Sequence, residues 1–252
     1  MILIDELTKI ARLLRLRPFQ AEKIYIQEHI LSSVFSHVSN ELVFKGGTAM
    51  MLCYSLPRFS EDLDFTLIRK FNLDRLPVLV QNDLEQFGIF SNIRVLKNTT
   101  VSFSFRVGAE GPLFTEEIER CYVRVEVSKK EEVILKPKVK EIYPPFSDLM
   151  PFSVYVMDEK EILAEKIRAF LTRLSARDLF DIWYMINKKD VEIDQELIQR
   201  KLKYYNKEFS VKDLEKRMIS LKDIWISELE PILLIRVPSF EKVRKDVLPR
   251  FR

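Results

Sequence analysis

Lys45-Gly46-Gly47-Thr48-Ala49 is the stretch of sequence that says most about the fold. The chain has only five glycines in 252 residues, and two of them stand side by side here. Glycine permits positive φ and close backbone approach, so main-chain N–H groups can face a phosphate. The residues that follow, 48–55, show the pattern of a helix, and a helix N-terminus favours anions. The stretch therefore predicts a phosphate-binding turn.

A second informative stretch, Ser60-Glu61-Asp62-Leu63-Asp64-Phe65, follows the predicted helix. On a β-strand, Asp62 and Asp64 point to the same side, about 7 Å apart along the chain. A bound cation would offset the repulsion between the two carboxylates. Mg²⁺ prefers oxygen ligands and often bridges carboxylates to substrate phosphates. Mg²⁺ or Mn²⁺ is therefore the expected cofactor; the alternative is a surface strand edge with two acidic residues.

Composition and charge narrow the class of protein. A hydrophobic fraction of 47% with 31% charged residues is ordinary for a globular protein. The net charge of +3 is too small to indicate a dedicated nucleic-acid binder. No apolar run approaches the ~18 residues of a membrane span, and the N-terminus lacks signal-peptide features. Cys53 and Cys121 form no disulfide framework. We expect a cytoplasmic protein with no membrane segment.

The hydrophobic pattern predicts an α+β protein in three segments. Residues 1–39 form a helical N-terminal arm, residues 40–150 a core with a mixed sheet, and residues 151–252 a helical C-terminal half. Within the core, apolar residues alternate with polar ones from about residue 92 to 134, as in half-buried strands. The other predicted elements are helices over 5–16, 18–37 and 74–87, and strands over 42–44, 62–68 and 153–156.

The order of turn, short helix and Asp-x-Asp strand resembles the DNA polymerase β-type nucleotidyltransferases. The amino-acid sequence of residues 44–49 and 56–65 resembles that of one branch, the AbiEii/AbiGii toxin family of abortive-infection toxin–antitoxin pairs. A second match covers residues 161–170, a helix bearing Lys166, and the Arg-Asp-x-x-Asp run at residues 177–181. The two blocks extend over most of the chain, from about residue 40 to 187, in the family's order and spacing.

The resemblance implies a nucleotidyltransferase core whose metal ions are held by carboxylates on neighbouring strands. Asp62 and Asp64 match the first two ligands, which are also the expected catalytic residues. For the third ligand, the predicted strand 121–128 offers Glu126, opposite the apolar valines of that strand. The alternative for Glu126 is an ordinary acidic residue on a solvated strand face.

The resemblance also implies a set of nucleotide-binding residues around the turn. Gly46 and Gly47 would place backbone amides on the phosphates, although Gly47 stands where the superfamily commonly has serine. Thr48 would supply the missing hydroxyl, or the backbone amides would suffice without it. Ser60, just before the Asp-x-Asp strand, would contact a phosphate or cap the turn, and the same alternatives apply to Arg58.

Three residues in the helical half complete the expected site. By resemblance, Lys166 contacts the nucleotide phosphates and contributes to catalysis; the alternative is a lysine whose stem packs on the core and whose ammonium reaches water. Asp178 and Asp181 share one helix face at i, i+3. The resemblance implies that Asp178 is catalytic and Asp181 binds nucleotide; their alternative is helix-dipole and ion-pair stabilisation with Arg177.

The expected function is metal-dependent transfer of a nucleoside monophosphate from an NTP to a tRNA or protein acceptor. The resemblance implies that the protein acts as the toxin of a pair, with a co-encoded antitoxin as partner. One alternative is a small-molecule nucleotidyltransferase of the antibiotic-modifying kind. Another is a nucleotide-binding module without catalysis, against which the presence of both aspartates argues.

Overall fold

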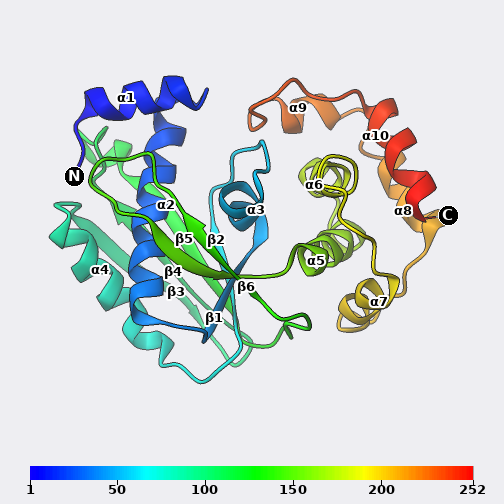
Figure 1. Ribbon diagram of the computed structural model, residues 1–252, viewed down its shortest axis with the longest axis horizontal. Helices are drawn as coiled ribbons and strands as arrows, with labels where there is room; N and C mark the ends of the chain where they lie inside the picture. Colours follow the sequence, from blue (N-terminus) through cyan, green and yellow to red (C-terminus); the bar gives the residue numbers. More distant parts are fainter. Residues whose placement is uncertain (252) are drawn as a thin grey trace. The chain divides into compact units, whose positions relative to one another are not determined.

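The computed structural model describes residues 1–251, which form two compact units (Figure 1). The first unit contains residues 1–55 and 59–157, and the second contains residues 56–58 together with the chain from Asp158 onward. This grouping differs from the three segments expected from the sequence. The N-terminal helices pack in the same unit as the sheet, and a three-residue segment near the Asp-x-Asp strand belongs with the C-terminal helices.

A mixed seven-stranded sheet forms the centre of the first unit, in the order β3-β4-β5-β2-β1-β7-β6. β1 is antiparallel to β2 and parallel to β7, while β2 is parallel to β5. This arrangement confirms the predicted α+β class. The strands are β1 Leu42–Lys45, β2 Leu63–Leu67, β3 Ser91–Asn98, β4 Ser102–Ala109, β5 Cys121–Ser128, β6 Lys138–Ile142 and β7 Phe152–Val156.

Helices pack on both sides of this sheet. α2 and α4 pack against each other, and α2 also contacts β5 and β7. α3, which begins at Gly46, lies on the other side of the sheet and contacts β1 and β2 (Figure 1). Pro18 stands at the first position of α2, where its missing N–H costs nothing. The helical elements are α1 Ile4–Leu13, α2 Pro18–His37, α3 Gly46–Tyr54, η1 Leu73–Arg75, α4 Leu76–Gln86 and η2 Glu117–Glu119.

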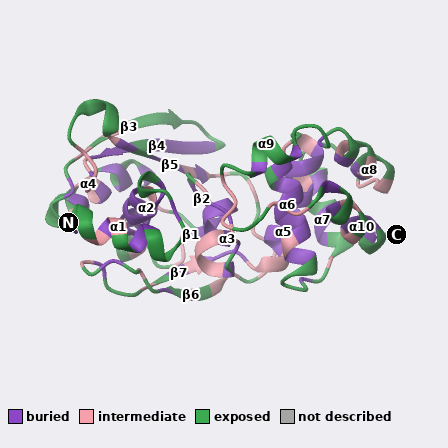
Figure 2. Cartoon of the chain, turned by 90° about the horizontal axis from the view of Figure 1, so that it is seen from above, coloured by how far each residue is buried: buried purple, intermediate pink, exposed green. Residues whose placement is uncertain are grey.

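The two faces of the sheet differ in chemistry because side chains alternate along each strand. On the face toward α2, apolar residues of β2, β4 and β5 are completely buried and form the core, as the purple strands in Figure 2 show. They are Leu63, Phe65, Phe103, Phe105, Val107, Val123, Val125 and Val127. The opposite face carries the polar residues of the same strands, Asp64 and Glu126 among them. The candidate catalytic carboxylates therefore lie on the face away from the main core.

The second unit consists of helices packed around α5 and α6. Several of these helices begin at a residue whose side chain accepts a backbone N–H, the usual N-cap; the capping residues are Asp158, Asp194, Ser210 and Ser239. Phe170, Phe180 and Trp225 are almost fully buried between the helices. The elements are α5 Glu159–Thr172, α6 Ala176–Asn187, α7 Gln195–Lys203, α8 Val211–Ile219, α9 Trp225–Leu229, α10 Phe240–Val247 and η3 Leu248–Phe251.

One strand was not predicted from the sequence. β6 lies at an edge of the sheet and pairs only with β7. Its lysines, Lys138 and Lys140, interrupt the apolar pattern, which is common on edge strands because charge discourages pairing with other chains. In residues 1–251, no helix combines the length and the apolar character that crossing a membrane requires.

A buried acid in α2 gives the first testable prediction. Glu28 is 3% exposed, and burial raises its pKa to about 8. The folded protein therefore binds a proton that the unfolded chain releases near pH 4.5, so stability falls as pH rises from 4.5 to 8. We expect Glu28→Gln to remove this slope and to raise the free energy of unfolding at pH 8 by about 1–3 kcal/mol.

Urea unfolding of both proteins between pH 5 and pH 9 tests this expectation. Glu85→Gln is the matched control, because Glu85 is an exposed glutamate of α4. Equal pH dependence in the wild-type and Glu28→Gln proteins would contradict a protonated Glu28.

Candidate functional site

The predicted turn brings the backbone of Gly46 against the Asp64 carboxylate. Gly46 has φ +77°, a conformation that residues with a side chain rarely adopt. A Cβ atom at Gly46 would lie 2.2 Å from Asp64 Oδ2, because Lys45 pairs with Asp64 in the β1–β2 register. Gly47 has no positive φ and lies buried in the first turn of α3. Of the pair, Gly46 is therefore the position that strictly requires glycine.

Gly46→Ala should consequently destabilise the first unit. The added methyl group would meet the Asp64 carboxylate, and the left-handed backbone itself costs about 1–2 kcal/mol for a non-glycine residue. We expect a loss of at least about 2 kcal/mol in the free energy of unfolding, measured by urea titration. Gly47→Ala is the matched control, since alanine suits a helical position. Equal stability of the two variants would show that the Gly46 turn can relax.

Thr48 and the backbone of residues 60–62 are fixed by hydrogen bonds. The Thr48 side chain is fully buried, and its Oγ1 donates to the Asp62 carbonyl at 2.5 Å. On the other side, Gln27 Nε2 of α2 donates to the Ser60 carbonyl at 3.0 Å. In this arrangement Thr48 positions the Asp62 backbone. Nucleotide binding by the Thr48 and Ser60 hydroxyls stays a prediction.

Of the three predicted metal-binding carboxylates, Asp64 and Glu126 lie in the sheet and Asp62 directly precedes β2. Asp64 pairs with Glu126 in the β2–β5 register, so both side chains lie on the same face. The Glu126 carboxylate, however, forms an ion pair with Arg124 at 2.9 Å. Partial desolvation raises the pKa of Asp62, although its side chain remains exposed; Arg124 opposes this shift and Glu61 adds to it.

The chemistry of this face fits a cation held by two protein carboxylates. Among residues 1–251, no set of three or more acidic, histidine or cysteine side chains is arranged to hold a metal ion. Mg²⁺ needs no such set, since it commonly takes one or two carboxylates and completes its shell with water and substrate phosphates. Asp62 and Asp64, beside the Gly46 turn, suit that mode. A ligand role for Glu126 stays a prediction and would require its carboxylate to leave Arg124.

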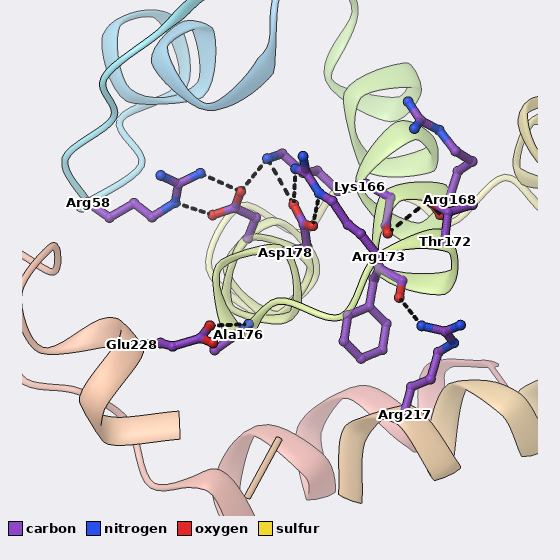
Figure 3. Close-up of polar contacts among 12 residues, drawn as sticks. Arg58, Lys166, Arg168, Thr172, Arg173, Ala176, Asp178, Arg217 and Glu228 are labelled. Atoms are coloured by element: carbon purple, nitrogen blue, oxygen red, sulfur yellow. Dashed lines mark hydrogen bonds and ion pairs between the residues drawn. The ribbon is translucent and has the colours of Figure 1, made fainter. Parts of the chain in front are cut away.

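The second unit contains a largely buried network of charged side chains that joins α5, α6 and the segment 56–58 (Figure 3). Arg58 donates two hydrogen bonds to the Asp181 carboxylate, from Nε to Oδ1 at 2.6 Å and from Nη2 to Oδ2 at 2.7 Å. Lys166 Nζ lies 2.7 Å from Asp181 Oδ2 and 3.4 Å from Asp178 Oδ1. Arg173 Nε adds a bond to Asp178 Oδ2 at 2.9 Å. The network thus joins three cations to two carboxylates.

Because these groups are buried, the charge state of each depends on its ion-pair partners. Asp181 is completely buried, and burial by itself raises a carboxyl pKa; Arg58 and Lys166 nevertheless hold the pKa of Asp181 below its usual range. Asp178 is equally inaccessible, whereas Arg173 is 63% exposed and reaches the surface. Lys166 is itself buried and ion-paired, so the alternative of an ammonium in water does not apply.

Arg58 is the residue of this network whose contacts could not be expected from the sequence. Its segment joins the helical unit through a β-bridge between Arg58 and Leu233, and the Leu234 N–H donates to the Pro57 carbonyl at 3.0 Å. Its carboxylate partner lies 123 residues away in sequence, so no local pattern indicates the pair. From the sequence alone, only a phosphate contact or a turn cap was expected at Arg58.

The glycine turn, the Asp-x-Asp strand and the mixed sheet are the marks of a nucleotidyltransferase. The family model for "Nucleotidyl transferase AbiEii toxin, Type IV TA system" matches residues 29–244. Because this match covers most of the chain, the protein belongs to the AbiEii nucleotidyltransferase toxin family. Among curated proteins, no match was found.

Solved structures share the fold. MenT4, a nucleotidyltransferase toxin from Mycobacterium tuberculosis, is 18% identical with a TM-score of 0.63, covering 97% of this chain and 88% of its own. A putative nucleotidyltransferase from Helicobacter pylori is 20% identical with a TM-score of 0.62; the match covers 90% of this chain and 91% of that chain. JHP933 from the same organism is 21% identical with a TM-score of 0.61; the match covers 92% of this chain and 89% of that chain.

Proposed function

We propose that this toxin transfers a nucleoside monophosphate from an NTP to a tRNA or protein acceptor, with Mg²⁺ or Mn²⁺ as cofactor. The observation that carries the proposal is the contact between the Gly46 turn and the Asp64 carboxylate. It supports a cation-binding role for Asp64, because this carboxylate lies beside the N-terminus of α3, where the anionic phosphates of a substrate are favoured. Membership of the AbiEii family supports the nucleotidyltransferase activity, the NTP substrate and an antitoxin partner.

In the proposed mechanism, backbone N–H groups at the start of α3 bind the triphosphate. Asp62 and Asp64 would hold the metal, which when bound offsets phosphate charge and favours deprotonation of the attacking hydroxyl. The acceptor oxygen forms a bond to the α-phosphorus as the bond to the β-phosphate oxygen breaks, so pyrophosphate leaves and the acceptor proton passes to solvent. Thr48 contributes by fixing the Asp62 backbone.

Lys166 has two candidate roles, which Lys166→Met separates. A lysine that stabilises charge on the transferring phosphate contributes about 3 kcal/mol, so we expect turnover to fall about 100-fold. We expect stability to hold, because the network keeps Arg58 and Arg173 opposite its two carboxylates. Initial rates of label transfer and thermal unfolding measure the two effects. Near wild-type turnover would assign Lys166 to folding alone.

The function is tested with purified protein, each labelled NTP in turn, Mg²⁺ and total tRNA, with a bacterial protein extract as a second acceptor. We expect label on tRNA or on a protein and stoichiometric release of pyrophosphate. Label only on an added aminoglycoside would favour the small-molecule alternative. NTP binding without pyrophosphate release would favour the inactive module.

The toxin role is tested in cells by induced expression. We expect growth to stop, and co-expression of the gene product encoded beside the toxin to restore it. Unimpaired growth at expression levels that give clear transferase activity in the extract would contradict a toxin role.

A further inference from the structure

Three arginines form a row across the polar face of the sheet. Arg94 of β3 pairs with Arg106 of β4, and Arg106 pairs with Arg124 of β5. All three side chains are exposed. β5 is followed by β2, where Leu63 pairs with Val125, so Asp62 is the next residue beside Arg124. The arginine row, Arg94, Arg106 and Arg124, therefore leads to the Asp-x-Asp strand.

This row works against folding. Like charges directly opposite each other on neighbouring strands are destabilising. Only Arg124 has an acidic partner, Glu126 at 2.9 Å; within residues 1–251, Arg94 and Arg106 have none at ion-pair distance. In the connection between β4 and β5, the carboxylates of Glu110 and Glu117 are already paired with Arg120. The arginine row thus carries more positive charge than the neighbouring carboxylates neutralise.

An aromatic side chain lies beside the arginine row. The Arg106 guanidinium sits over the Tyr122 ring, 4.6 Å from its centroid. Tyr122 faces Gly108 across the β4–β5 ladder, where a Cβ atom would lie 2.8 Å from the ring. Gly108 therefore lets the ring lie against the β4 backbone, and the Tyr122 residue stays 38% exposed. A guanidinium beside an exposed ring is the combination that binds bases and phosphates of single strands.

We propose that the arginine row binds the backbone of a single-stranded nucleic acid and that Tyr122 stacks on one of its bases, with one end of the strand directed to Asp62. With strands about 4.8 Å apart, the row is about 10 Å long. That length corresponds to three intervals of about 3.4 Å along a stacked strand, so three to four phosphates lie along the row. Guanidinium groups suit phosphates because they donate in a planar fork. The direction toward Asp62 rests on the proposed function; the binding itself does not.

A simpler explanation is that charge on an edge strand prevents aggregation. It accounts for Arg94, because β3 is an edge strand and is exposed along most of its length (Figure 2). It does not account for Arg106 and Arg124, which lie on inner strands of the sheet. An acidic protein surface is a different partner for the same charges, and the experiment distinguishes it.

The test measures binding of a fluorescent oligouridine to the whole protein by anisotropy, without NTP, at 50 to 300 mM salt. Each phosphate contact on a single strand contributes about 0.7 to the slope of log K against log salt. We expect Arg94→Gln/Arg106→Gln/Arg124→Gln to lower the slope by about 2 and Arg106→Gln alone by about 0.7. Arg12→Gln is the matched control, an exposed arginine of α1, and should leave the slope unchanged.

Two further readouts separate a binding role from a structural one. We expect Tyr122→Leu to weaken oligouridine binding about tenfold through lost base stacking. We expect the triple variant to unfold at the same or a higher temperature, since it loses like-charge repulsion. An unchanged salt slope in the folded triple variant would overturn the proposal. So would equal wild-type affinity for polyglutamate, which would assign the row to an acidic protein. Because no NTP is present, failure of the transferase assay leaves this result unaffected.

Discussion

Asp64→Ala is expected to abolish nucleotidyl transfer and to leave the fold intact. The substitution removes a proposed metal ligand on the polar face of β2, whereas the core contacts of this strand come from Leu63 and Phe65 on the other face. Metal stabilisation of a phosphoryl transition state is worth several kcal/mol, so we expect the rate to fall at least about 1000-fold. Initial rates of label transfer at saturating NTP and Mg²⁺ measure the effect.

Three variants sharpen this experiment. Asp64→Asn keeps the shape but loses the charge, and we expect it to fail as Asp64→Ala does. Asp62→Ala should also lose activity, because Asp62 is the second proposed ligand. Asp5→Ala, at an exposed acid of α1, is the control and should keep full activity. The metal assignment is wrong if folded Asp64→Ala retains wild-type turnover, or if a chelator has no effect on the wild type.

Local patterns in the sequence were sufficient to predict the strand faces on which the proposed metal ligands lie. Alternation put Asp64 and Glu126 on the polar face of their strands, and the β2–β5 register makes them neighbours. The positive φ expected for the glycine pair falls on Gly46. The ion pair between Arg124 and Glu126 follows from the same i, i+2 alternation, although it was not anticipated.

The charged network of the second unit could not be predicted in the same way. Helical spacing indicated that Asp178 and Asp181 share a face, and both do contact Lys166. The network is completed by Arg58, which comes from a segment far away in sequence. Hydrophobic periodicity reports which face of one helix is apolar; it does not report a charge supplied by another segment.

The buried Arg58–Asp181 pair leads to the largest expected loss of stability. Asp181→Ala leaves the Arg58 guanidinium buried; Asp178, the other carboxylate that acts on its charge, is already bound by Arg173. Arginine cannot lose its proton to escape this cost. Breaking a buried ion pair by removing one partner commonly costs about 3–5 kcal/mol, and we expect a loss of that size here. Guanidinium chloride unfolding, followed by the fluorescence of Trp183 and Trp225, measures it in the second unit.

A double variant separates loss of the pair from loss of any other Asp181 role. Replacing both partners of a buried ion pair by apolar residues is often nearly neutral, so Arg58→Met/Asp181→Leu should recover most of the stability that Asp181→Ala loses. The recovery should be incomplete, because Lys166 also loses its 2.7 Å partner and keeps only Asp178 at 3.4 Å. If the recovered protein also regains nucleotidyl transfer, Asp181 serves folding alone. If it folds but stays inactive, the Asp181 carboxylate contributes to the reaction or to nucleotide binding. A loss below about 1 kcal/mol in Asp181→Ala would contradict the buried pair itself.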